Sequence, residues 1–159
     1  PGFRTLADAG RDWGLQLVME NHYGLTRSSE DTLEFIRRVG AENMFVNLDT
    51  GNFWDDCVSL RDMLLAGGSI DEVPLIEDPY EGMERLLPRT TYTHCKIYRL
   101  TSDNTNDEVL DYERILRMFV RAGFDGVLSI ENFTLDDPME IVPRAAEMLR
   151  RQITKLDSS

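Results

Sequence analysis

Four short apolar runs each close on a residue that can bind a metal or move a proton. The runs, with their closing residues, are 15–20 (Glu20), 44–49 (Asp49), 91–94 (His94) and 127–131 (Glu131). The closing residues are 29, 45 and 37 positions apart. A strand, its crossover helix and the return to the next parallel strand need about 30 residues or more. The four side chains can therefore stand at equivalent ends of four successive parallel strands.

Three carboxylates and one imidazole form a hard, oxygen-rich set of donors. Such a set favours Mn²⁺, Mg²⁺ or Co²⁺ over a thiolate-type zinc site, with Zn²⁺ as a weaker option. Three neighbouring acids would repel one another, and a divalent cation is the simplest way to keep them ionised. A polar side chain at the end of one strand needs no special role, but four at near-equal spacing predict a shared metal site.

The elements that carry these residues alternate between strand and helix. Strands are predicted at 15–20, 44–49, 91–97 and 127–131, and helices at 3–11, after Ser28 or Ser29, at 58–66, after Asp78 and after Asp111. A last helix begins either at Pro138 or near Ile141 and runs to about Ile153. This alternation indicates a parallel sheet with helices outside it, in a barrel or in a doubly wound sheet. Neither of the common glycine-rich phosphate loops is present to favour the doubly wound sheet.

Capping residues mark where the predicted helices begin and end. Ser28 or Ser29, Asp78 and Asp111 carry side-chain oxygens that can accept hydrogen bonds from the first backbone N–H groups of a helix. Gly40 and Gly123 suit the left-handed turn that often follows a helix. These signals place the helices between the predicted strands.

The composition excludes several classes of partner. The 159 residues carry 17 basic and 29 acidic side chains, which gives a formal charge of −12. An acidic surface repels phosphate backbones and anionic lipids, so we expect binding to neither nucleic acid nor a membrane surface. Cys57 and Cys95 have no paired spacing, and no apolar stretch approaches the roughly 20 residues of a membrane span. We expect a cytoplasmic protein.

Five motifs, in order along the chain, resemble those of a known family. They are Glu20-Asn21-His22, Leu48-Asp49-Thr50-Gly51-Asn52-Phe53, His94-Cys95-Lys96, Asp111-Tyr112 with Gly123-Phe124-Asp125-Gly126, and Ser129-Ile130-Glu131. Together, from about Leu15 to Leu149, they resemble the sugar phosphate isomerase/epimerase family, whose fold is the xylose isomerase-like TIM barrel. The resemblance implies an α/β chain that forms the C-terminal half, about four βα units, of a (β/α)8 barrel of roughly 250 residues.

The resemblance also implies roles for the residues that close the runs. The metal ligands would be Glu20, Asp49, His94 and Glu131, and the two glutamates would also exchange the substrate proton. The implied enzyme is a divalent-metal-dependent isomerase or epimerase of a sugar, a sugar phosphate or a hydroxy-keto acid. The cation would polarise a carbonyl, and one glutamate would remove the proton on the adjacent carbon to give an enediolate. The other glutamate, or a water, would return a proton.

Three further residues are candidate substrate contacts. His22 and Lys96 could stabilise a developing oxyanion or orient hydroxyl groups, although Lys96 could equally pair with a ligand carboxylate. Asn52 stands where the ketose epimerase branch of the family usually carries a substrate-binding histidine. That branch also carries an arginine where this sequence has Leu100, one position after Arg99. These two departures count against a simple free-ketose epimerase.

Three other functions remain open from the sequence. A keto-inositol dehydratase or another lyase of the family would use the same metal and the same proton abstraction, followed by loss of a hydroxyl group. An endonuclease of this fold would need several more histidines for its zinc cluster, whereas the chain has only His22 and His94. A non-catalytic homologue or an inactive fragment would be recognised by measuring bound metal.

We expect residues 1–159 to be one domain, a curved half-barrel that lacks the first strands of the barrel. The sequence opens on Pro1 inside a helical pattern, which leads us to expect an upstream part. The outer strands would expose unpaired backbone groups, which invite pairing with another chain. We therefore expect a homo-oligomer or poor solubility, and weaker metal binding than in a whole barrel. Sedimentation and a thermal melt test this, and a monodisperse monomer with a sharp, high melting transition would contradict it.

Overall fold

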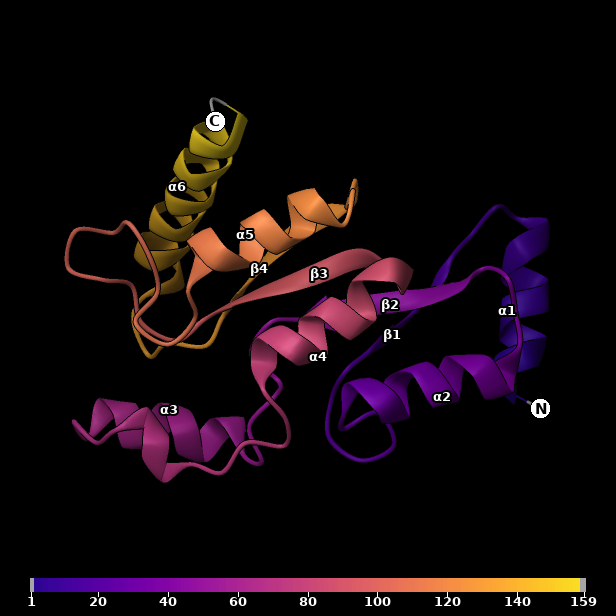
Figure 1. Cartoon of the computed structure of the whole chain (residues 1–159), viewed down its shortest axis with the longest axis horizontal. Helices are drawn as coiled ribbons and strands as arrows, with labels where there is room; N and C mark the ends of the chain where they lie inside the picture. Colours follow the sequence, from indigo (N-terminus) through magenta and orange to yellow (C-terminus); the bar gives the residue numbers. More distant parts are fainter. Residues whose placement is uncertain (1, 158–159) are drawn as a thin grey trace.

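A four-stranded parallel sheet forms the centre of the chain (Figure 1), in a computed structural model that describes residues 2–157. The strands are β1 (Leu17–Glu20), β2 (Met44–Asp49), β3 (Thr90–Ile97) and β4 (Val127–Asn132). Their order in the sheet is their order in the chain, and each pairs in parallel with the next. All four strands were predicted, and their C-terminal ends lie along one edge of the sheet.

Helices connect the strands and flank the sheet. They are α1 (Gly2–Asp12), α2 (Ser29–Val39), α3 (Cys57–Leu65), α4 (Pro79–Leu86), α5 (Tyr112–Arg121) and α6 (Pro138–Asp157), with short 3-10 turns η1 (Ile70–Glu72) and η2 (Leu87–Arg89). Helix α6 starts at Pro138, contains Pro143, and continues beyond the predicted end at Ile153. The extra turn forms because Leu156 packs against the hydrophobic core.

The predicted caps begin and end the helices as expected. The side chain of Ser28 accepts a hydrogen bond from a backbone N–H in the first turn of α2, and Asp78 and Asp111 each accept two in α4 and α5. Gly40 and Gly123 adopt left-handed φ angles of 65° and 68° after α2 and α5. These local signals hold each helix in place between two strands.

The two faces of the sheet are covered to different degrees. Helix α2 contacts β1 and β2, α4 contacts β2, and α6 contacts β4. Val46 and Leu48, which alternate with the ligand candidate of β2, are completely buried. On the ligand-bearing face, Val18 of β1 and Val127 of β4 keep exposed fractions of 44% and 52%. The outer strands are thus the open parts of this sheet.

The described helices have no membrane-spanning character. Within residues 2–157, none has the length and apolarity that a lipid bilayer span requires. The longest, α6, carries charged side chains along most of its length.

Candidate metal centre

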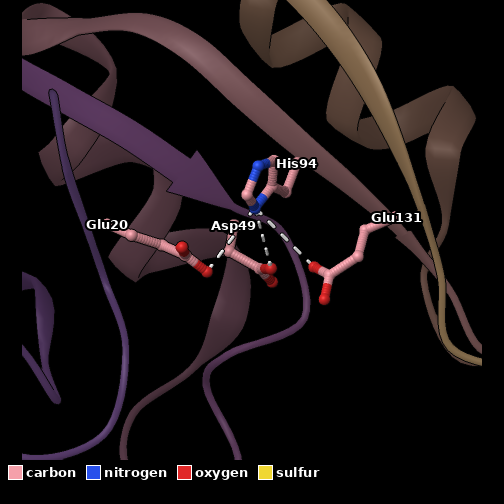
Figure 2. A group of neighbouring side chains, drawn as sticks. All are labelled: Glu20, Asp49, His94 and Glu131. Atoms are coloured by element: carbon pink, nitrogen blue, oxygen red, sulfur yellow. Dashed lines mark ion pairs between the residues drawn. The ribbon is translucent and has the colours of Figure 1, made fainter.

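The four predicted ligand residues meet at the C-terminal edge of the sheet. One donor atom from each of them lies within 4.8 Å of the others. Figure 2 shows three carboxylates directed toward the ring of His94. The distances from His94 Nδ1 are 3.5 Å to Glu20 Oε1, 3.8 Å to Asp49 Oδ2 and 3.7 Å to Glu131 Oε2. Because each residue comes from a different strand, the whole sheet positions this cluster, which we call the ligand cluster.

Two carboxylate oxygens in the ligand cluster suit a cation. Asp49 Oδ2 and Glu131 Oε2 are buried and accept no well-oriented hydrogen bond from the described residues, although the Lys96 ammonium lies 3.2 and 3.3 Å from them. A buried carboxylate oxygen needs a positive partner, and hard divalent cations prefer oxygen donors. The donor set therefore fits Mg²⁺ or Mn²⁺, with the imidazole of His94 as the nitrogen donor.

Burial dominates the electrostatics of the Asp49–Glu131 pair. It raises the pKa of Asp49 well above its usual value, against the opposing charge of Lys96. Burial acts in the same direction on Glu131, but there the contact with Asp49 and the charge of Lys96 outweigh it, so the pKa of Glu131 is lowered. Burial thus favours the neutral form of Asp49, whereas the contacts of Glu131 favour its ionised form.

Lys96 extends from β3 into the ligand cluster. Its Nζ lies 3.2 Å from Asp49 Oδ2 and 3.3 Å from Glu131 Oε2, and it donates a hydrogen bond of 2.8 Å to Asn52 Oδ1. The residue is only 2% exposed. The structure thus shows the pairing with ligand carboxylates that the sequence left open, while contact between Lys96 and a substrate stays a prediction.

The other two candidate substrate contacts lie in different surroundings. Asn52 is buried, and its Nδ2 donates to Glu20 Oε1 at 3.1 Å, so its amide joins Lys96 to Glu20. His22 is exposed, and its ring packs edge-on against Tyr23 with 4.7 Å between the ring centroids. His22 is not a member of the ligand cluster. Substrate binding by Asn52 and His22 stays a prediction.

Leu100 and Arg99, which mark a departure from the epimerase branch, face other parts of the chain. Leu100 belongs to the buried core. The guanidinium of Arg99 donates to the Leu64 carbonyl at 3.1 Å and pairs with Glu108 at 2.5 Å. Arg99 therefore connects the loop after β3 to α3 and is not directed at the ligand cluster.

Asn21 and Thr50 brace the ligand cluster and were not predicted from the sequence. Asn21 accepts a hydrogen bond from the Asp49 N–H at 2.8 Å and donates one to the Asp49 carbonyl at 3.0 Å. Thr50 Oγ1 accepts from the Lys96 N–H at 3.0 Å, and the Tyr112 hydroxyl donates to the Lys96 carbonyl at 2.7 Å. The only sequence signal for Asn21 and Thr50 is that each directly follows a predicted ligand.

Known proteins resemble this chain in sequence or in fold. A curated relative, the C-glycoside deglycosidase alpha subunit of Arthrobacter globiformis, is 30% identical over 82 residues, which are 47% of this chain and 23% of that protein. A xylose isomerase-like TIM barrel protein from Mycobacterium smegmatis, solved in complex with magnesium, has a TM-score of 0.66 at 22% identity over 98% of this chain and 48% of that one. An L-ribulose 3-epimerase has a TM-score of 0.64 at 17% identity, over 98% of this chain and 54% of that one.

The comparisons settle the fold and the family. The chain spans about half the length of the two solved structures, so its four parallel strands form part of a barrel. It spans less than a quarter of the curated relative. Residues 1–152 match the family described as xylose isomerase-like TIM barrel. Because this match covers nearly the whole sequence, the chain belongs to the xylose isomerase-like TIM barrel family.

Proposed function

We propose that this chain supplies the metal centre and the proton-transfer groups of an isomerase or epimerase. Its substrate would be a sugar, a sugar phosphate or a hydroxy-keto acid. The observation that carries the proposal is the ligand cluster, in which four donor atoms lie within 4.8 Å of one another. The fold shared with an L-ribulose 3-epimerase supports a carbohydrate as the substrate class.

The ligand cluster would hold the cation. When bound, a divalent cation supplies Lewis-acid polarisation of a carbonyl beside the reacting carbon. A polarised carbonyl makes the proton on the adjacent carbon more acidic, so a carboxylate base becomes sufficient to remove it. We therefore assign the proton transfers to the two glutamates of the ligand cluster.

In this proposal, Glu131 and Glu20 act on opposite sides of a substrate. They come from the two outer strands, β4 and β1, and their carboxylates flank the ring of His94 (Figure 2). Glu131 takes the proton, and the electrons of the C–H bond form the enediolate. Glu20, after taking a proton from solvent, gives it to the opposite side of the enediolate, and Glu131 releases the proton that it took to solvent. The hydrogen bond from Asn52 fixes the direction of the Glu20 carboxylate.

Solvent deuterium exchange tests this reaction. We expect the intact protein, supplied with Mn²⁺ in D₂O, to place deuterium on the carbon next to the carbonyl of one class of substrate. A panel of keto sugars, keto-sugar phosphates and hydroxy-keto acids would be followed by NMR, and Mn²⁺ binding by titration calorimetry. Release of water from the substrate would favour the dehydratase alternative. Mn²⁺ binding without exchange into any of these classes would contradict the proposed reaction.

A further inference from the structure

Lys96 carries an inference that deepens the proposed function and rests on it. We propose that the Lys96 ammonium is a built-in counter-ion of the ligand cluster. It holds Asp49 and Glu131 side by side when no cation is bound, and it lowers the affinity of the cluster for a divalent cation. Lys96 is thus a positioning residue that regulates metal binding.

The fold fixes the Lys96 ammonium against two buried carboxylate oxygens. Its Nζ lies 3.2 Å from Asp49 Oδ2 and 3.3 Å from Glu131 Oε2, and neither oxygen accepts a well-oriented hydrogen bond from the described residues. Asn52 Oδ1 accepts from the same ammonium, and the ring of Phe133 lies 4.7 Å from it. Lys96 is only 2% exposed, so water screens the charge of its ammonium weakly.

A glycine makes room for the Lys96 side chain. A Cβ atom built on Gly51 would lie 2.6 Å from Lys96 Cδ and 2.9 Å from a ring carbon of Tyr98. Real Cβ atoms do not approach so closely, so any side chain at position 51 would push the Lys96 stem aside. The N–H of Gly51 also donates to Asp49 Oδ1 at 2.7 Å. The turn after β2 thus gives Lys96 its path and positions the carboxylate that Lys96 faces.

The charges of the cluster set the direction of the effect. With all three carboxylates ionised, as a bound divalent cation would favour, the cluster carries −3, and the Lys96 ammonium reduces this to −2. A divalent cation among the same oxygens would lie a few ångströms from the ammonium and be repelled by it. Even with strong screening, such repulsion corresponds to about a tenfold or larger loss of affinity. The ammonium also offsets the repulsion between the carboxylates of Asp49 and Glu131. A cation can therefore bind ligands that are already positioned.

Variants of Lys96 separate its charge from its packing. Lys96→Met and Lys96→Gln remove the charge, Gln keeps hydrogen-bonding groups, and Lys96→Arg keeps the charge as the matched control. By titration calorimetry with Mn²⁺ at one mildly alkaline pH, we expect the Met and Gln variants to bind at least about tenfold more tightly than the wild type. We expect the Arg variant to stay within about threefold of the wild type because the repulsion remains.

Thermal melts give a second readout that a purely structural role would not move. With a chelator present, the Met and Gln variants should melt below the wild type, because their carboxylates have lost the counter-ion. Saturating Mn²⁺ should bring the melting temperature of both variants back toward that of the wild type. The rise in melting temperature that Mn²⁺ causes should therefore be larger in the variants than in the wild type. A Met variant that folds only with Mn²⁺ would support the proposal in the same way.

Three results would overturn the counter-ion role. One is Mn²⁺ affinity that is unchanged or weaker in both uncharged variants. Another is a melting temperature lowered equally with and without Mn²⁺, which would make Lys96 a packing residue only. If Lys96→Met folds neither with nor without Mn²⁺, the same measurements on Lys96→Gln test the proposal.

A wild-type protein that binds no Mn²⁺ would overturn the proposed metal centre as well. A wild type that binds Mn²⁺ with the same affinity as the uncharged variants would overturn the counter-ion role alone.

Discussion

Glu131→Gln should reduce turnover of the intact enzyme by about 10²–10⁴-fold, the usual contribution of a positioned proton-transfer group. The amide has nearly the shape of the carboxylate but cannot accept the proton from the substrate carbon. Its oxygen can still face a cation, so Mn²⁺ binding should persist in weakened form. Since Glu131 lies between His94 and Lys96, at 3.7 and 3.3 Å, the substitution changes the chemistry without opening a cavity.

The measurement is deuterium incorporation at the substrate carbon, with Mn²⁺ affinity measured in parallel. Saturating Mn²⁺ separates loss of the base from loss of the metal. Glu84→Gln, at an exposed position on α4, is the matched control and should leave exchange unchanged. Exchange at the normal rate in the Glu131→Gln variant would rule out Glu131 as the sole base of this step.

Asp107→Ala should lower the free energy of unfolding by about 3 kcal/mol or more. Asp107 is buried in the loop that follows β3, and its carboxylate accepts hydrogen bonds from four backbone N–H groups, those of Tyr98, Arg99, Val109 and Leu110. Alanine would leave these donors without an acceptor, and a buried donor left unpaired costs about 1–3 kcal/mol. The loop begins directly after β3, which carries His94 and Lys96, so its collapse would also disturb the ligand cluster.

Urea denaturation of the wild type and the variant measures this loss. Asp103→Ala is the matched control, because Asp103 lies in the same loop but is exposed, and its hydrogen bonds within residues 2–157 go to its neighbours Thr101 and Thr105. It should cost less than about 1 kcal/mol. If Asp107→Ala loses no more free energy of unfolding than Asp103→Ala, the four hydrogen bonds to Asp107 do not stabilise the fold as expected.

The sequence predicted the parts of the structure that depend on local signals. Each predicted strand formed because a short apolar run suits a buried parallel sheet, and Asp78 and Asp111 start helices because their side chains satisfy the first N–H groups. The four ligand candidates meet because parallel strands place their C-terminal ends at one edge. Spacing and alternation along the chain were enough to bring Glu20 and Glu131 to the same side of the sheet.

The features that the sequence did not predict depend on contacts between distant segments. Asp107 binds N–H groups on both sides of its loop, and only the folded loop brings them to one carboxylate. Lys96 had two equal interpretations because its partners come from β2 and β4. Helix α6 continues beyond its predicted end at Ile153 because Leu156 packs against the hydrophobic core, which is a tertiary contact. The turn η1 lies in a stretch without apolar periodicity, so neither a helix nor a strand could be predicted there.

The sheet can grow in the order in which the chain is synthesised, because each strand pairs with the strand that precedes it in the sequence. When β2 leaves the ribosome, β1 is already available to it, and the same holds for β3 and β4. The last member of the ligand cluster, Glu131, is in the last strand. In the proposed function, a metal ion could therefore bind the complete cluster only after β4 has been made. Its binding energy would then link β4 to the three strands that precede it in this sheet.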